Sequence, residues 1–275
     1  MITKFSFMLP ALLCAAVVGL AGCVVEPAKP YVALPSPDDI RQRTDTVTKQ
    51  PTLNLIPRAD QREQGDGIAA EYISKYRRIG RDVFESGTDA RFVRLEKIFD
   101  KVHARSHLDQ ERLQPVLVAK DQFQAYTTGG TIIIFYTGLT ERLSDDALAM
   151  VIGHEIAHLA AGHVAEQSSR DLVNVNANET QLLGSYSIIN EHEADAVGMV
   201  YATLAGFDPA AAAAIWSALA RDDDERLQLF NTTHPSDGAR ADILREKAAL
   251  IESLRNAPDW VKLRQCNPVY CATSP

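Results

Sequence analysis

The stretch Ser144-Asp-Asp-Ala-Leu-Ala-Met-Val-Ile-Gly-His-Glu-Ile-Ala-His-Leu-Ala-Ala-Gly162 decides the fold. A serine followed by two acids is typical of a helix N-terminus, and Gly162 is typical of a helix end. The residues between them are apolar nearly all round, which predicts a helix buried on every side. The only strongly polar groups in its second half belong to His154-Glu155-Ile156-Ala157-His158.

The spacing of these polar residues predicts a metal site. Residues four apart share one helix face, so the imidazoles of His154 and His158 can reach one ion, with Glu155 beside them. This is the geometry of a zinc protease, in which a carboxylate lies near the metal-bound water. Two core histidines are the alternative, but they and a charged glutamate would be costly to bury in an apolar helix without a partner. Metal binding removes that objection.

A third zinc ligand is expected from Glu191-His192-Glu193-Ala194-Asp195. On a helix, Glu191 and Asp195 share a face, whereas Glu193 points elsewhere. We therefore expect Glu191 to be the third ligand. Asp195 is expected to orient a zinc-bound histidine, with His154 as its partner.

The other polar residues of this stretch have structural explanations. Glu193 follows Asn190 at the spacing of a capping box, which predicts a helix from Asn190 to a stop at Gly206. We expect Glu193 to be a capping or surface residue and His192 to face the solvent.

Three further histidines lie outside this pattern. A metzincin motif places glycine three and histidine six positions after its second histidine, which His163 does not satisfy. We expect His163 to interact with the dipole at the end of the preceding helix. His103 and His107 have helical spacing, but no glutamate follows His103, so metal binding there is disfavoured.

The segments before the motif predict two helices and a small sheet. Apolar residues recur at helical spacing from Ile68 to Ile79, and again from Phe92 to Val102 after Thr88 as N-cap. Strand-like runs at 116–119 and 123–126 lead to a hairpin at Gly129-Gly130. Two further helices are expected, one after Asp208-Pro209 and one from about Ser236 to Asn256.

The N-terminus predicts an exported lipoprotein. Lys4 precedes an almost wholly apolar run from Phe5 to Leu20, which matches a secretory signal. Leu20-Ala-Gly-Cys23 resembles the lipobox of bacterial lipoproteins, which implies cleavage after Gly22 and acylation of Cys23. No Asp follows Cys23 as an inner-membrane retention signal, so the periplasmic face of the outer membrane is favoured. A transmembrane anchor is the alternative, since the run from Phe7 is just long enough to span.

Composition sets further limits. The chain has 275 residues, 46% of them hydrophobic and 23% charged, which is typical of a globular protein. Its net charge of −8 comes without a basic stripe, so nucleic acid is not an expected partner. In an exported protein, Cys266 and Cys271 are expected to form a disulfide, with two free thiols as the alternative. The expected regions are a signal (1–22), a lipidated cysteine with a Pro-rich tether (23–64), a metallopeptidase domain (65–256) and a tail (257–275).

Several pieces of sequence between Asn54 and Asn256 occur in a characteristic order. They are Phe123-Gln-Ala-Tyr126 through Thr137-Gly-Leu139, the HEIAH and EHEAD stretches, Gly206-Phe-Asp-Pro209, and His234-Pro-Ser through Arg240. Together they resemble the M48 family of zinc metallopeptidases, and with the lipobox its periplasmic lipoprotein members. The resemblance implies a zincin-like α+β fold, mainly α, with a hairpin beside the HExxH helix.

The resemblance also implies a set of functional residues. His154, His158 and Glu191 would hold one Zn²⁺, and Glu155 would be the general base. His234 is expected near the active site, either donating to the oxyanion or capping zinc as a reversible off-switch. Without the resemblance, His234 reads as an exposed loop histidine. Arg240 is expected either to orient a ligand or the substrate, or to be a surface cation.

The expected function is endopeptidase activity against misfolded or damaged periplasmic and outer-membrane proteins. Membrane contact would be through the lipid on Cys23. Two alternatives stay open: a chaperone-like module with little proteolysis, and a structural lipoprotein in which zinc is a staple without an exchangeable water.

Overall fold

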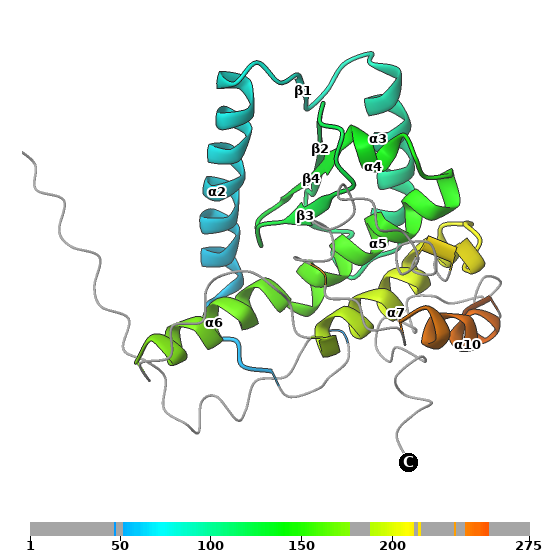
Figure 1. Ribbon diagram of the computed structural model, residues 1–275. Coiled ribbons are helices and arrows are strands. Elements are labelled where there is room, and N and C mark those ends of the chain that lie inside the picture. Colours follow the sequence, from blue (N-terminus) through cyan, green and yellow to red (C-terminus); the bar gives the residue numbers. More distant parts are fainter. Residues whose placement is uncertain are drawn as a thin grey trace, which may run out of the picture. The chain divides into compact units, whose positions relative to one another are not determined.

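The computed structural model describes residues 52–176, 188–211 and 240–252, together with positions 47, 214, 215 and 234. Within these residues, a four-stranded sheet is flanked by helices (Figure 1). This confirms the prediction of a mainly helical α+β domain. The signal with Cys23, the Cys266–Cys271 pair and the expected helix start at Ser236 lie outside the described residues.

The sheet contains the predicted hairpin at its edge. Its strand order is β1-β2-β4-β3, with β2 and β4 parallel and the other pairs antiparallel. The hairpin joins β3 to β4 and turns at Gly129, whose φ of +90° is a left-handed conformation that favours glycine. The strands are β1 (Val83–Phe84), β2 (Gln114–Val118), β3 (Ala125–Thr127) and β4 (Ile132–Tyr136).

Helices cover both faces of the sheet. α2 (Arg58–Arg78) packs on one face through a small apolar cluster that includes Ile73 and Tyr76. α3 (Ala90–His103) and α5 (Asp145–Ala161) pack on the other face and belong to the larger core. The strand side chains alternate between these two clusters, as the period of a β-strand requires.

The helix predicted from the opening stretch is present with the expected ends. Ser144 is the N-cap of α5, and its hydroxyl accepts a hydrogen bond from Ala147 N at 3.2 Å. Gly162 ends the helix with φ +76°. All residues from Ala147 to Ala161 are buried, as the all-round apolar pattern predicts.

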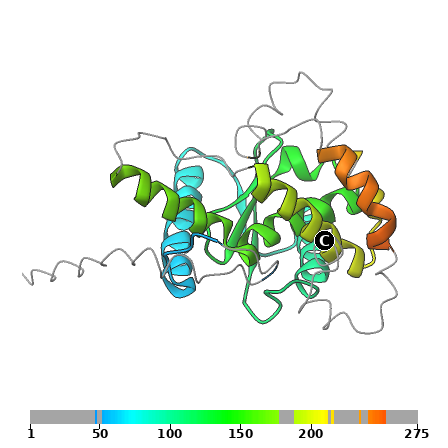
Figure 2. The ribbon, with the colours of Figure 1, turned by 90° about the horizontal axis from the view of Figure 1, so that it is seen from below.

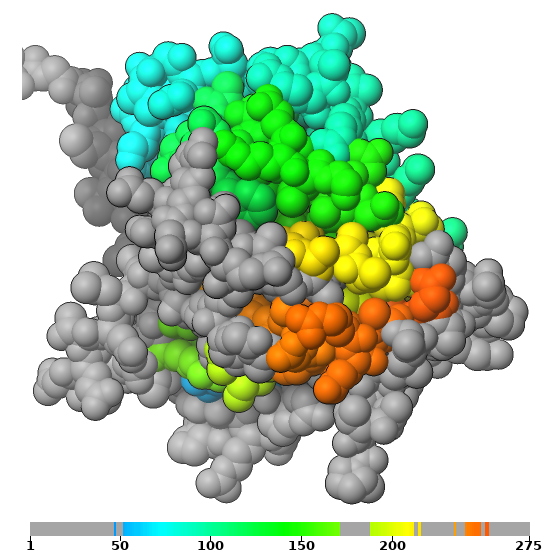
Figure 3. All heavy atoms as spheres, turned by 45° about the vertical axis from the view of Figure 1, so that its right-hand side comes forward, coloured from blue at the N-terminus to red at the C-terminus, as the bar shows by residue number. Residues whose placement is uncertain are grey.

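α7 (Ile188–Leu204) lies against α5, and α10 (Arg240–Glu252) lies against α7. The view from below shows these two helices side by side (Figure 2), and the space-filling view shows α10 at the surface beside the yellow end of α7 (Figure 3). Backbones of α5 and α7 meet at Gly153 and Gly198, where an added Cβ would lie within 3.0 Å of the facing helix. The described residues also include the short helix α4 (Thr137–Thr140) and the longer helix α6 (His163–Asn176). Positions 210, 211, 214 and 215, which follow Asp208-Pro209, are helical as predicted.

The first helix differs from the sequence prediction in two ways. α2 begins at Arg58, so residues 58–64 are helical although we placed them in the tether. The apolar residues at helical spacing are also only partly buried: Ile73 and Tyr76 face the core as predicted, whereas Ile68, Tyr72 and Ile79 are 46%, 41% and 62% exposed. The small or polar residues Gln61, Gly65 and Ala69 complete the buried face.

The N-cap of α3 is Asp89 and not Thr88. The Asp89 carboxylate accepts hydrogen bonds from the backbone N–H of Arg91 and of Phe92. Its hydrogen bond with the Arg91 side chain lowers the pKa of Asp89 to about 2. A carboxylate at this position also interacts favourably with the helix dipole.

Candidate metal centre

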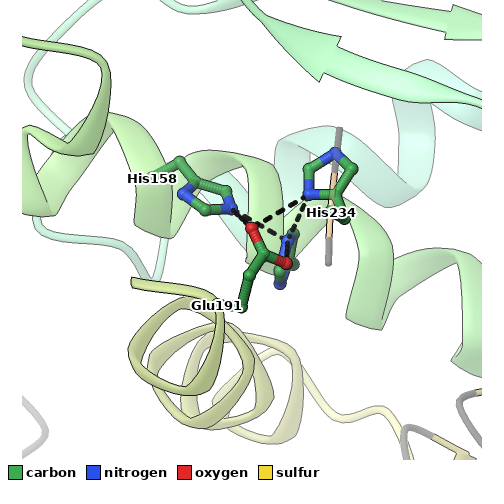
Figure 4. A group of neighbouring side chains, drawn as sticks. His158, Glu191 and His234 are labelled. Carbon is green, nitrogen blue, oxygen red and sulfur yellow. Dashed lines mark hydrogen bonds and ion pairs between the residues drawn. The ribbon is translucent and has the colours of Figure 1, made fainter. Parts of the chain in front are cut away.

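Four buried side chains converge between α5 and α7. His154 and His158 come from α5, Glu191 from the first turn of α7, and His234 from the segment before α10. Their candidate ligand atoms all lie within 4.8 Å of one another. Figure 4 shows the side chains of His158, Glu191 and His234 pointing toward a common centre.

The facing atoms in this group are nearly all within hydrogen-bond or ion-pair distance. His154 Nε2 lies 2.9 Å from His158 Nε2 and 3.2 Å from His234 Nδ1. Glu191 Oε1 lies 3.3 Å from both His158 Nε2 and His234 Nδ1. Three members of this group are the residues that the sequence predicts as zinc ligands, and the fourth is His234, which the resemblance places near the active site.

Asp195 and Arg240 contact two members of this group, His154 and Glu191. His154 Nδ1 lies 2.9 Å from Asp195 Oδ1, and Arg240 donates to both carboxylate oxygens of Asp195 at 2.7 and 2.8 Å. A third guanidinium nitrogen lies 2.9 Å from Glu191 Oε2. Arg240 is only 1% exposed, so the surface-cation interpretation is wrong. Because the Asp195 carboxylate accepts the proton on Nδ1, His154 Nε2 presents a lone pair to the group.

Glu155 lies on α5 next to His154, and its side chain is fully buried. It is not one of the four converging side chains; its Oε1 lies 3.5 Å from His234 Nε2. Burial raises the pKa of Glu155 above its ordinary value, although His234 and His154 oppose this effect. A carboxyl group whose pKa is shifted toward neutrality is suited to accept and return a proton.

The other carboxylate, Glu191, is affected in the opposite direction. Burial alone would raise its pKa, but His234, His158 and His154 hold the pKa of Glu191 well below its usual range. Burial, with the neighbouring His154, lowers the pKa of His158 well below that of a free histidine. An ionised glutamate and a neutral imidazole are the forms in which these side chains bind metal.

His163 and Glu193 occupy places that the sequence did not predict. His163 is the first residue of α6 and is buried, with its Nδ1 2.9 Å from His158 Nδ1, so the expected helix-end role is wrong. α7 begins before Asn190, so the expected capping box is wrong as well. The Asn190 side chain donates to Glu166 at 3.0 Å, and Glu193 lies 3.6 Å from His163 Nε2.

The two rings of the other histidine pair have different partners. His103 Nε2 lies 2.8 Å from the backbone oxygen of Leu108, whereas His107 Nδ1 lies 2.5 Å from the Tyr201 hydroxyl. Among the described residues, neither belongs to a group of potential metal ligands. His192, beside Glu191, is half-buried.

The donors present fit a divalent cation. Nitrogen from imidazole and oxygen from carboxylate are the ligands that zinc takes in proteins, and the site brings both to one point. The carboxylates of Glu155, Glu191 and Asp195 are all buried here, whereas Arg240, which contacts Glu191 and Asp195, is the one buried guanidinium among the described residues. The excess negative charge in this apolar surrounding favours binding of a cation.

Comparison with known proteins decides the family. The description "Peptidase family M48" matches residues 89–177 and 169–248, which together are more than half of the chain. The chain belongs to this family. The matched residues include α5 and α7, which carry His154, His158 and Glu191, and also position 234.

Named relatives of this M48 chain include enzymes from a plant and a bacterium. The protein is 30% identical to "Mitochondrial metalloendopeptidase OMA1" of Arabidopsis thaliana over 173 residues, covering 56% of this chain and 36% of that protein. It is 27% identical to "Metalloprotease LoiP" of Escherichia coli over 154 residues, covering 48% of this chain and 61% of that protein. The chain thus spans less than two thirds of either relative.

No single helix in the described part of this M48 chain has both the length and the apolar character needed to span a membrane. Only α5 combined with residues 163–170, bent by 54°, has the necessary length and composition. These residues of α5 are buried in the protein core and carry His154 and His158.

Proposed function

We propose that this protein is an endopeptidase that uses one Zn²⁺ held by His154, His158 and Glu191. The observation that carries the proposal is the convergence of these buried side chains beside Glu155, which is not among them. Bound zinc would supply Lewis-acid chemistry by polarising the carbonyl of the peptide bond. The Arg240–Asp195 pair keeps His154 in the required tautomer and also contacts Glu191.

Glu155 carries the proton in this proposal. Its carboxylate takes a proton from the attacking water and later delivers it to the leaving amine. The raised pKa of Glu155 supports this role, because burial weakens the preference of the carboxyl group for its charged form. Glu191, whose pKa is lowered, remains charged as a ligand.

A Glu155→Gln variant tests the mechanism. We expect zinc binding close to that of the wild type and a loss of casein hydrolysis of about 10²–10⁴-fold or more, because the amide cannot accept the proton. Glu191→Gln is the contrasting variant and should weaken zinc binding. His192→Asn, next to Glu191 but outside the converging group, is the matched control. Wild-type turnover by Glu155→Gln would contradict the mechanism.

The alternatives are a chaperone-like module and a structural zinc site. Chelation separates them from an enzyme, because a peptidase loses casein hydrolysis with chelator and regains it with zinc. A chaperone-like protein would suppress aggregation without cleavage. A structural site would lose thermal stability on chelation and show no cleavage before it.

We propose that an extended segment of a misfolded protein binds along β3. This strand is at the edge of the sheet within the described residues, and β3 contacts α5. The backbone N–H of Thr127, at the end of β3, is close enough to Glu155 to lower its pKa. An edge strand offers main-chain groups to any unfolded sequence, which suits an enzyme that acts on misfolded proteins.

His234 is proposed to restrain the activity. Its two ring nitrogens face opposite sides of the site, with Nδ1 toward Glu191 and Nε2 toward Glu155 at 3.5 Å. Burial lowers the pKa of His234, but Glu191 and Glu155 more than offset this and raise it. Because His234 lies among the candidate ligand atoms, its ring would take the open position on a bound zinc that the attacking water needs. His234→Ala should therefore raise basal activity, whereas a loss would favour an oxyanion role.

We propose that the enzyme is anchored through lipid on Cys23 at the periplasmic face of the outer membrane and acts on envelope proteins there. The lipobox-like stretch Leu20-Ala-Gly-Cys23 supports this proposal. Cys23→Ser should abolish the mass added by the acyl groups and change the membrane fractionation. Unchanged fractionation would refute the anchor.

A disulfide between Cys266 and Cys271 belongs to the same proposal, because it requires an oxidising compartment. Thiol titration of the denatured, unreduced protein should give no signal from these two cysteines. Two titratable thiols would contradict both the bridge and the compartment.

A further inference from the structure

We infer that His163, held by Glu193, is a positioning residue that fixes the tautomer and ring orientation of His158. The inference rests on the proposed function, since it takes His158 to be a zinc ligand. It assigns to His163 and Glu193 a role in building the metal site, although neither is one of the four converging side chains.

The turn between α5 and α6 brings the two rings together. α5 ends at Ala161, and Gly162 adopts φ +76°, so the chain bends by 54° before α6 begins at His163. This places the imidazole of His163 against that of His158, with ring centroids 5.0 Å apart and an interplanar angle of 74°. Both rings are buried, so water has little access to replace either one.

The need for a lone pair on the zinc-binding nitrogen determines which nitrogen of each ring carries its proton. A zinc ligand needs a lone pair, and His158 Nε2 is the nitrogen that faces His154 and Glu191. Neutral His158 must therefore carry its proton on Nδ1, which lies 2.9 Å from His163 Nδ1. Two nitrogens at this distance share one proton, so His163 Nδ1 accepts and its own proton is on Nε2.

Glu193 stabilises that arrangement. His163 Nε2 lies 3.6 Å from Glu193 Oε2, and both side chains are largely buried. A carboxylate at this distance favours a proton on the facing nitrogen over one on Nδ1. Through the contacts from Glu193 to His163 and from His163 to His158, the proton of His158 is held on Nδ1 and its lone pair on Nε2. Asp195 holds the proton of His154 on Nδ1 in the same way.

Zinc affinity of the purified full chain, measured by competition with a chromophoric chelator, tests the inference. His163→Phe keeps an aromatic ring but removes the acceptor, and we expect zinc affinity to fall about 10–100-fold. His163→Asn places an amide oxygen near the position of Nδ1, so it should restore most of the lost affinity. Glu193→Gln, which conserves volume, should fall between His163→Asn and His163→Phe. His192→Asn is the control on α7.

Comparison of the His163→Phe and His163→Asn variants separates a role in orienting His158 from a role in packing. Melting of the metal-free variants reports packing, and a merely structural role predicts that affinity follows metal-free stability. Wild-type affinity in His163→Phe would overturn the inference, and so would an equal loss in His163→Asn. If His163→Phe does not fold, unchanged affinity in Glu193→Gln overturns it.

These outcomes are distinct from failure of the proposed function. A wild-type chain that binds no zinc would refute the proposed function and this inference together. Zinc binding by the wild type, with activity lost in Glu155→Gln and full affinity in His163→Phe, would refute only the positioning role.

Discussion

Among the described residues, glycines of two different elements face each other at two contacts, which have different roles. At the crossing of α5 and α7, Gly153 faces Gly198. At the contact of α2 with the β3–β4 hairpin, Gly65 faces Gly130. A Cβ on any of these four glycines would lie closer than 3.0 Å to backbone atoms of the facing element.

The difference lies in what surrounds each contact. Gly153 precedes His154, and Gly198 lies one turn after Asp195, so the helix crossing sets the distance between the ligand-bearing faces. The hairpin contact is instead joined by polar bonds: Arg58 donates to Gly129 O at 2.8 Å, and Asp66 accepts from Thr131 N at 2.6 Å. The first contact therefore controls the metal group, and the second controls the position of the edge strand.

The largest effect is expected from Gly153→Ala. Its methyl group would press against the backbone of Gly198, and backbone cannot move away as a flexible side chain can. Overpacking of this kind costs about 1–3 kcal/mol or more. We expect a fall in Tm of roughly 5–10 °C, with 1 kcal/mol corresponding to about 2–4 °C in a chain of this size. Zinc affinity, measured by competition with a chelator, should fall as well, because the two helices separate. Unchanged zinc affinity would contradict the claim that the contact of α5 with α7 controls the metal group.

Gly65→Ala should have a smaller effect of a different kind. The new methyl group would press on Gly130 N, but α2 belongs to the smaller apolar cluster, so its movement away from the hairpin exposes less apolar surface than a separation of α5 from α7. α2 contributes none of the four converging side chains, so zinc affinity should stay at the wild-type value. KM for casein should rise, since β3 moves with the hairpin. A loss of zinc affinity equal to that of Gly153→Ala would show that the two contacts are not separate.

Asp66→Ala tests the polar part of the hairpin contact without adding a clash. The carboxylate accepts from both the backbone N–H and the hydroxyl of Thr131, so its removal should cost about 1.5–3 kcal/mol. Chemical denaturation gives this cost directly. Asp66→Asn, which keeps one acceptor oxygen, is the matched control and should lose less. Equal losses in the two variants would assign the effect to charge alone.

The smallest effect is expected at Asp89, which is remote from both contacts. Removing this N-cap should destabilise the protein by about 1 kcal/mol, and zinc affinity and KM should not change. Asp89→Ala thus gives the baseline for a purely local loss, measured in the same denaturation and competition assays. A change in zinc affinity here would mean that general destabilisation explains the other variants.

The sequence predicts the parts of this structure that depend on local pattern. α5, with its caps, follows from apolar character and the residues at its ends, and the hairpin follows from a glycine pair between two apolar runs. The placement of His154 and His158 on one face of α5, and of Glu191 and Asp195 on one face of α7, follows from helical spacing. Each of these features is determined by residues close together in the chain, whereas the meeting of the two faces depends on the crossing of α5 and α7.

The features that were missed depend on distant partners. Asn190 and Glu193 have the spacing of a capping box, yet their side chains contact Glu166 and His163 across a helix–helix contact. For Arg240 the sequence leaves open a residue that orients a ligand or the substrate and a surface cation, and only tertiary packing against Asp195 and Glu191 decides against the surface cation. One signal for His163 was present: a histidine directly after the glycine that ends the ligand-bearing helix.

The error in α2 has a similar cause. Its large apolar residues suggested a buried face through Ile68 and Tyr72, but close backbone contact at Gly65 turns smaller residues such as Ala69 toward the sheet. Periodicity gives the helix, whereas the contact with the hairpin sets its rotation.

The division of the core by the sheet has a consequence for native-state dynamics. The cluster beneath α2 has few members and is separate from the larger core around α5. Local opening therefore requires much less apolar surface to be exposed at α2 than at α5. We expect amide protons of α2 to exchange with solvent sooner than those of α5, in a partial unfolding that leaves His154, His158 and Glu191 in place. The four converging side chains would then lie in the part of the protein that opens most slowly, while α2 opens and closes independently.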